Sequence, residues 1–280
     1  MALEKKLQHF GSDWTEEKLD IFSDYLNAYL TALKNMKFKK IYIDAFAGTG
    51  EIETGNRKII MGSARRALSA SNQFDLYYFI EKNKSKASEL KLMVEREYPE
   101  LKDRVTVYQG DANEQLKRII DSIDWRYNRA LLFLDPYATQ VDWKTLEIVA
   151  ATKAIDVWYL FPLSALNRML KKDGKLDSSW ATCIDRLLGT TDWRQAFYRE
   201  NPQLSLFDAK PLIKTANTES LTNYIIKRLE TIFPAVSKKA KIFYNDKNSP
   251  LFFFCFAVSN PSLKAQQLAL KIANSILSTD

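Results

Sequence analysis

The sequence predicts an α/β fold in which a mostly parallel, Rossmann-like sheet is covered by helices. Short apolar runs alternate with stretches of helical spacing along the 280 residues, which is the pattern of parallel strands joined by helices. A glycine-rich turn, DAFAGTG at residues 44–50, follows the first apolar run. Rossmann-like sheets place a ligand-binding turn at this point.

Five apolar runs are predicted as parallel strands. They are residues 39–46, 74–80, 104–109, 129–135 and 155–161. Two later runs, residues 241–245 and 251–259, are joined by the turn-like DKNSP and predict a hairpin that reverses the last strand. Seven strands with an antiparallel last strand are typical of the class I methyltransferase sheet rather than of a dehydrogenase sheet.

Helical patterns account for most of the remaining chain. A helix is expected at residues 13–36, with Asp13 or Thr15 as its N-cap. Residues 163–233 are predicted as a helical insertion after the fifth strand, available for substrate recognition. Residues 1–162 and 234–280 then form the Rossmann-like domain.

Composition narrows the chemistry. His9 is the single histidine, so a Ser-His-Asp or Cys-His scheme would rest on it alone, and a site with several histidine ligands is impossible. The two cysteines, Cys183 and Cys255, suit unpaired thiols in a reducing compartment. The longest apolar run has strand length, and the first residues lack the apolar core of a signal peptide. We therefore expect a cytoplasmic protein without a membrane span.

The formal net charge of +7 favours an anionic partner such as a nucleic acid. Within the insertion, Lys171, Lys172 and Arg194 are interleaved with tryptophans, a combination that suits phosphate contacts and base stacking. A helical cover with a solvated basic face and core tryptophans is the alternative.

The turn at residues 44–50 favours S-adenosylmethionine (SAM) over a dinucleotide. Glycines let backbone N–H groups approach a ligand closely, but Asp44 at the strand end would repel a pyrophosphate. A carboxylate there suits the ammonium of a methionine moiety. An ordinary tight turn between strand and helix is the alternative.

Two further acidic residues follow the next strands. Glu81 ends the second strand, where an acidic side chain can accept both ribose hydroxyls, and Asp111 follows the third, where methyltransferases hold the adenine amino group. Taken alone, each fits an exposed cap or turn. Together they converge on the crevice expected at the carboxyl ends of the strands. The residues assigned to the cofactor are Asp44, Phe46, Gly48, Gly50, Glu81, Asp111 and Ala112.

The fourth strand ends in Asp135, Pro136 and Tyr137, which are predicted as the catalytic residues. Amino methyltransferases carry an (Asp/Asn/Ser)-Pro-Pro-(Tyr/Phe) motif here, whose acceptors polarise the target amine and whose aromatic ring stacks on the base. This chain is one proline short, which leaves the position of the ring open. A proline-stiffened turn with a packed tyrosine is the alternative.

The order DAFAGTG, FIEKN, QGDANE and LLFLDPYATQVDW, preceded by WTEEKLDIFSDYL, resembles the three-Cys-motif partner proteins, a bacterial family. The resemblance covers residues 14–149, and FAVSNPSLKAQQLALKI near the end also fits. It implies a class I, SAM-dependent methyltransferase-like fold and a protein partner with a three-cysteine motif. More broadly, the pattern is similar to the adenine-N6 methyltransferases of DNA and ribosomal RNA.

The predicted function is SAM-dependent methylation of an exocyclic amine in DNA or RNA. A small-molecule or protein methyltransferase would use the same cofactor pocket. A non-catalytic, methyltransferase-like adaptor that binds nucleic acid or a protein is the rival from another class. No metal is expected.

Overall fold

The computed structural model describes residues 13–53, 59–201 and 212–278. His9 lies outside these ranges. The predicted first helix is present as α1 (Asp13–Ala32), which ends four residues earlier than expected.

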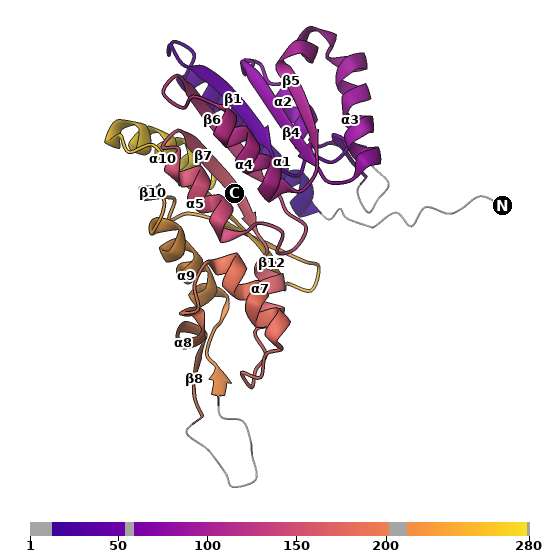
Figure 1. The fold of residues 1–280 in the computed structure, drawn as a ribbon. Coiled ribbons are helices and arrows are strands. Elements are labelled where there is room, and N and C mark those ends of the chain that lie inside the picture. Colours follow the sequence, from indigo (N-terminus) through magenta and orange to yellow (C-terminus); the bar gives the residue numbers. More distant parts are fainter. Residues whose placement is uncertain (1–12, 54–58, 202–211, 279–280) are drawn as a thin grey trace, which may run out of the picture.

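The central sheet has the predicted mostly parallel arrangement (Figure 1). Its strand order is β10-β12-β7-β6-β1-β4-β5, and β11 also pairs with β12. The strands are β1 (Lys39–Asp44), β4 (Leu76–Glu81), β5 (Val105–Gln109), β6 (Asn128–Leu134), β7 (Ile155–Phe161), β10 (Ala235–Val236), β11 (Lys241–Tyr244) and β12 (Pro250–Val258).

The predicted late hairpin is confirmed by the pairing at one edge. Strands β1, β4, β5, β6 and β7 run parallel, whereas β12 is antiparallel to β7. Both β10 and β11 pair antiparallel with β12, so they act as one interrupted edge strand. This order, with its reversed strand, is the class I methyltransferase sheet, and the predicted fold class is confirmed.

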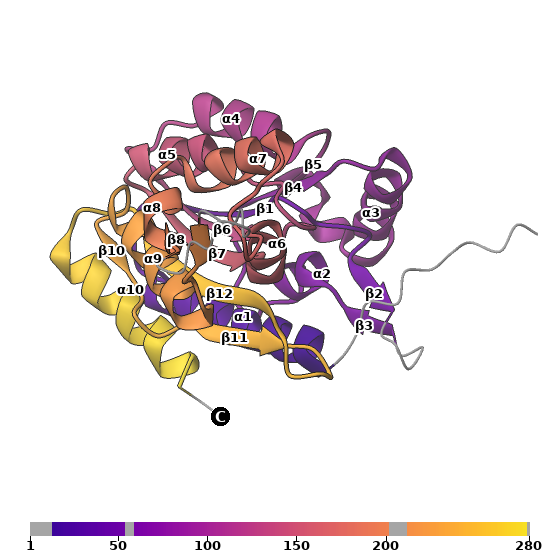
Figure 2. The ribbon, with the colours of Figure 1, turned by 90° about the horizontal axis from the view of Figure 1, so that it is seen from below.

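Helices cover both faces of the sheet (Figure 2). One face packs against α1, α2 (Ser63–Leu68), α3 (Lys84–Glu97) and α10 (Leu263–Ile276). The other packs against α4 (Ala112–Ser122), α5 (Trp143–Ala151) and the helices of residues 163–233. Side chains along β1 alternate between the two faces of the sheet, so Ile41 and Ile43 belong to one core and Tyr42 belongs to the other. A short 3₁₀ helix, Pro99–Arg104, follows α3.

Helix α1 is fixed on the sheet by aromatic packing. The ring of Phe22 stacks on Phe133 of β6 at 4.1 Å between centroids, and Tyr25 meets Trp158 of β7 edge-on at 5.3 Å. Such pairs contribute about 0.5–1.5 kcal/mol beyond the area they bury. The packing sets the direction of the helix and therefore the side chains that it brings to the ends of the strands.

The glycine-rich turn does not lead directly into a helix, as the sequence pattern suggested. It enters a hairpin of β2 (Glu51–Glu53) and β3 (Ile59–Met61), and α2 begins only at Ser63. The N-terminus of a helix therefore does not follow the glycines immediately.

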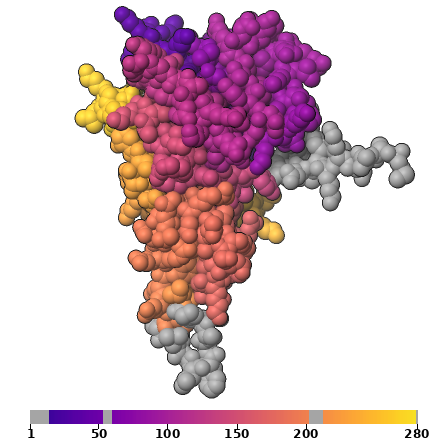
Figure 3. Space-filling model, in the orientation of Figure 1, coloured from indigo at the N-terminus to yellow at the C-terminus, as the bar shows by residue number. Residues whose placement is uncertain are grey.

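Residues 163–233 contain strands as well as the expected helices. The helices are α6 (Leu163–Met169), α7 (Ser178–Leu188), α8 (Trp193–Phe197) and α9 (Thr218–Glu230), and β8 (Tyr198–Glu200) pairs with β9 (Leu212–Lys214). The described residues of α7, α8, β8 and β9 lie toward the tapered end of the molecule (Figure 3). Leu187 of α7 and Phe197 of α8 belong to the same core as Leu221, Ile225 and Leu229 of α9.

No helix in the described ranges is long and apolar enough to span a membrane.

Candidate cofactor and amine site

A crevice of about 260 Å³ lies at the carboxyl ends of the parallel strands. It sits where the chain order reverses between β1 and β6, the place where open α/β sheets bind ligands. Seven of the predicted site residues line it: Phe46, Gly48, Glu81, Asp111, Ala112, Asp135 and Tyr137. It is also lined by Ala45, Lys82, Lys86, Gly110 and Gln140.

The turn after β1 requires glycine at position 48. Gly48 has a φ of +61°, in the left-handed region that other residues rarely adopt. Its N–H donates to Oε2 of Glu81 at 3.0 Å. A Cβ at this position would meet no atom within 4 Å, so the space beside the turn is open to a ligand.

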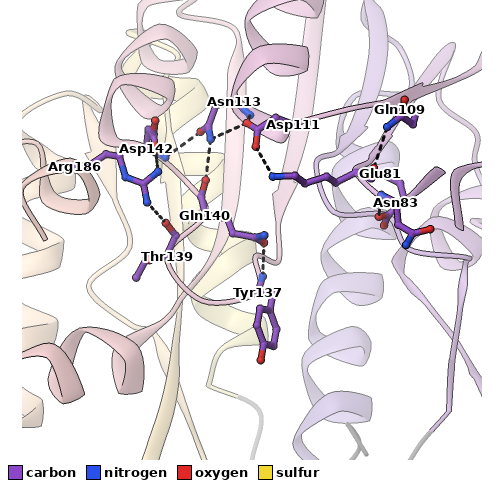
Figure 4. Close-up of polar contacts among 11 residues, drawn as sticks. Glu81, Asn83, Gln109, Asp111, Asn113, Tyr137, Thr139, Gln140, Asp142 and Arg186 are labelled. Atoms are coloured by element: carbon purple, nitrogen blue, oxygen red, sulfur yellow. Dashed lines mark hydrogen bonds and ion pairs between the residues drawn. The ribbon is translucent and has the colours of Figure 1, made fainter. Parts of the chain in front are cut away.

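Glu81 is held at the end of β4 by backbone donors. Besides Gly48, the N–H of Asn83 donates to its Oε1 at 2.7 Å (Figure 4). Two backbone bonds orient the carboxylate and leave further acceptor capacity on each oxygen, because a carboxylate offers about four lone-pair positions. The group is therefore prepared to accept from a pair of hydroxyls.

Asp111 begins α4 as its N-cap. Its side chain accepts from the backbone N–H of Asn113 at 3.0 Å and from the ammonium of Lys82 at 3.4 Å (Figure 4). Partial burial raises the pKa of Asp111, but these bonds, with one from the Asn113 side chain, outweigh it and bring the pKa below its ordinary value. The carboxylate is thus ionised and accepts only.

Asn113 connects the segment after β5 to the loop after β6. Its amide donates to the carbonyl of Gln140 at 2.8 Å, while its Oδ1 accepts from Thr145 at 2.7 Å. The side chain of Gln140 in turn accepts from the backbone N–H of Tyr137 at 3.1 Å (Figure 4). The sequence interpretation missed Asn113 and Gln140, and the spacing of the motifs contains no signal for them.

Arg186, from the 163–233 segment, also holds the loop that follows β6. Arg186 of α7 donates to the carbonyl of Thr139 at 3.0 Å and lies 3.0 Å from Oδ1 of Asp142 (Figure 4). The loop that carries Tyr137 therefore depends on α7 as well as on the sheet.

Asp135 forms an ion pair that the sequence interpretation did not include. Lys18 of α1 lies with its Nζ 2.5 Å from Oδ2 of Asp135, and the two side chains are 4% and 25% exposed. The ammonium also lies 5.3 Å from the ring centre of Trp14. The available signal was a lysine on the apolar face of the helix, since positions 18, 22 and 25 share that face.

Three predicted site residues do not line the crevice: Asp44, Gly50 and Pro136. Asp44 is fully buried and accepts from Ser63, Tyr42 and the N–H of Phe46. Burial raises the pKa of Asp44 to about 6, and its hydrogen bonds act in the opposite direction. It therefore supports the turn from beneath rather than facing a ligand.

The other two residues, Gly50 and Pro136, lie in closely packed surroundings. Gly50 has a φ of +84°, and a Cβ there would lie 2.8 Å from Cε of Met93 in α3. Pro136 is buried.

The predicted nucleic-acid contacts differ in their availability. Arg194 makes a two-pronged pair with Asp185, at 2.8 and 3.1 Å, and lies against Trp193. Lys171 lies 3.3 Å from Asp177, whereas Lys172 is exposed. Arg194 and Lys171 are thus each paired with an acid of the segment.

Within the described ranges, no group of three or more His, Cys, Asp or Glu side chains is placed to hold a metal ion.

A scan against protein-family models finds no match for the chain, and a search of curated proteins finds none. Solved structures do match. The chain is similar over 92% of its length to 92% of a Legionella pneumophila protein of the DUF519 family, at 11% identity and a TM-score of 0.48. It is similar over 90% to 84% of an O-methyltransferase from Bacillus cereus in complex with SAH, at 14% identity and a TM-score of 0.44. It also matches, over 85%, 99% of the methyltransferase domain of bacterial CtHen1, at 12% identity and a TM-score of 0.38.

The class of fold follows from the sheet itself. The order β12-β7-β6-β1-β4-β5 with an antiparallel β12, together with a crevice at the carboxyl ends, defines a Rossmann-like fold of the class I methyltransferase type. The resemblance to the three-Cys-motif partner family stays a prediction.

Proposed function

We propose that the chain is a SAM-dependent methyltransferase that acts on an exocyclic amine of a nucleobase in DNA or RNA. The observation that supports this most strongly is the lining of one crevice by Glu81, Asp111 and Asp135. These acids lie at or just after the carboxyl ends of three different strands and meet beside the turn at Gly48.

The lining has the chemistry that the cofactor requires. In this proposal Glu81 accepts from the ribose hydroxyls and Asp111 from the adenine amino group, while Phe46 and Ala112 contact the adenine ring. The open space beside Gly48 admits the methionine part, and Asp44 acts through the shape of the turn. The cofactor supplies an electrophilic methyl group.

The amine site is proposed at the neighbouring end of β6. Lys18 holds Oδ2 of Asp135, so the target amine would donate to Oδ1 and to the carbonyl of Pro136. Tyr137 is 63% exposed at the crevice, where its ring can stack on a base. A base within a duplex would have to be flipped out to reach it.

The partners belong to the same proposal. The net charge of +7 and the exposed Lys172 favour a nucleic acid, and the family resemblance adds a protein with a three-cysteine motif. A cytoplasmic location accords with these partners.

A non-catalytic adaptor is the second candidate. The ion pair between Lys18 and Asp135 favours it, because the acid that would polarise the amine is already engaged. An adaptor of this kind would bind nucleic acid or protein and transfer no methyl group.

The proposal is tested by incubating the protein with radiolabelled SAM and total bacterial nucleic acid, followed by digestion to nucleosides. Calorimetric titration with SAH measures cofactor binding separately. Labelled nucleoside, lost in Asp135→Ala but kept in Glu89→Gln on the exposed surface of α3, supports the enzyme. Removing one such electrostatic contact should lower the rate by about 10²–10³-fold.

The variants separate the candidates only when they remain folded. Because Asp135→Ala leaves Lys18 buried without its partner, Lys18→Met/Asp135→Ala is measured beside it. Cofactor binding without any transfer to nucleic acid would favour the adaptor or another substrate class. Absence of SAH binding at millimolar concentration would refute the cofactor assignment.

A further inference from the structure

A second cavity lies at the opposite end of the sheet from the crevice. It has a volume of about 370 Å³ and is lined by α1, α10 and the first residues of β6 and β7. Arg129 and Asp156 are the second residues of those strands, so the cavity opens at their amino ends. Its volume falls in the range of small-molecule pockets.

The walls are largely aromatic and aliphatic. Tyr25 and Tyr29 of α1 line it together with Leu268 and Ile272 of α10 and with Phe38, which lies ahead of β1. An apolar lining with a few convergent polar groups is the usual composition of a ligand site.

Polar residues also line this apolar space: Arg129, Asn260, Ser262 and Lys264, together with Tyr25 and Asp156, which carry the proposal. Tyr25 is fully buried, and its hydroxyl has no hydrogen-bond partner among the described residues. Asp156 also lines the cavity, and its charge acts on both Tyr25 and Tyr29. An unpaired buried hydroxyl is unfavourable, and a ligand that bonds to it would remove that cost.

Arg129 is a cation near Asp156, but its hydrogen bonds go elsewhere, so the carboxylate of Asp156 can bind a ligand. Arg129 donates hydrogen bonds to the backbone carbonyls of Trp125 and Asn128, and its guanidinium lies over the ring of Phe38. The backbone N–H of Ser259 donates to Asp156. The carboxylate keeps acceptor capacity for a donor that enters from the cavity.

We propose that this cavity binds a small, mainly apolar molecule whose single head group, an amine or alcohol, donates a hydrogen bond to Asp156. The apolar body lies between Tyr29 and the α10 side chains, and the head group also accepts from or donates to the Tyr25 hydroxyl. The site is separate from the crevice and does not depend on the proposed methyl transfer.

The probes are 4-phenylbutylamine, 4-phenylbutanol and 4-phenylbutyrate, titrated into the full chain by calorimetry and by ligand-observed NMR. The amine and the alcohol should bind, and the carboxylate should bind at least about tenfold more weakly, because it would face Asp156 with a like charge. Asp156→Asn should weaken the amine about tenfold and the alcohol less.

A matched pair of surface variants locates the binding. Leu268 lines the cavity and is 45% exposed, whereas Leu92 on α3 is 47% exposed and lies outside it. Leu268→Trp should block the cavity and abolish binding of the amine, and Leu92→Trp should leave it unchanged. The proposal is overturned if no probe binds, if binding survives Leu268→Trp, or if the carboxylate binds as well as the amine.

Discussion

Removing either partner of the ion pair between α1 and β6 should destabilise the protein, and the two removals should differ. Lys18→Met leaves Asp135, whose side chain is a quarter exposed, so water can replace the lost donor. We expect the free energy of unfolding to fall by about 1–3 kcal/mol, the usual cost of a polar group left without a partner. Asp135→Ala leaves an ammonium that is almost fully buried, and about 3–5 kcal/mol is expected.

The control is an ion pair of similar length on the surface. Lys117 and Asp121 of α4 lie 2.6 Å apart, compared with 2.5 Å for Lys18 and Asp135, but their side chains are 60% and 59% exposed. Lys117→Met should cost at most about 0.5 kcal/mol, because hydration and salt screen an exposed pair. The comparison separates the effect of burial on stability from the effect of the distance between the two charges.

The assay is urea unfolding followed by circular dichroism, at low salt and at 0.5 M salt. The deficit of Lys18→Met should persist in salt, whereas the small effect of Lys117→Met should shrink. Equal costs for Lys18→Met and Lys117→Met, or a smaller cost for Asp135→Ala than for Lys18→Met, would refute the reasoning.

Three further outcomes are expected. Glu81→Gln should weaken SAH binding by about 1.5–3 kcal/mol in calorimetry, and an unchanged affinity would remove Glu81 from the cofactor site. Burial raises the pKa of Asp156 from 3.8 to about 7, against the Ser259 hydrogen bond and the charge of Arg129. The folded state then binds the proton more tightly, so stability should fall as pH rises from about 4 to about 7 and stay level above. Urea unfolding should show this slope in the unmutated chain and a smaller one in Asp156→Asn. Lys171→Glu/Lys172→Glu should weaken nucleic-acid binding and reduce the slope of affinity against salt, with an unchanged slope excluding this surface.

The parallel sheet was predictable mainly because its central strands, β1, β6 and β7, are buried on both faces, whereas the edge strand β5 is only partly buried. Strands buried on both faces are continuous apolar runs that stand out in the sequence, and all five were predicted within a few residues of their ends. The hairpins β2–β3 and β8–β9 were missed. Their strands have three residues each and depend on pairing across a turn rather than on an apolar run.

It was equally predictable that acidic residues near the carboxyl ends of the strands would lie close together. Glu81, Asp111 and Asp135 follow parallel strands, so topology alone brings them to one edge. Asp44 differs because it shares a face with Tyr42, two residues earlier, and a strand alternates its side chains with period two. Its carboxylate therefore points into the core beneath α1 and α2.

Lys18 is harder to predict because it lies far from Asp135 in the sequence. It is 117 positions from Asp135 in sequence, and only the packing of α1 on β6 brings the two together. A buried lysine on an apolar helix face indicates that an acid lies nearby. The sequence does not say which acid.

The motif at Asp135–Tyr137, predicted as catalytic, lacks a second proline, and other contacts fix the loop that follows β6. A proline would fix φ through its own ring. Here Ala138 adopts a φ of +57°, and Tyr137 donates its N–H to Gln140. Asn113 and Arg186 then bind the same loop from α4 and α7. The loop that carries Tyr137 is thus held by α4 and by α7 of the 163–233 segment, so a change in the position of α7 should move the loop as well.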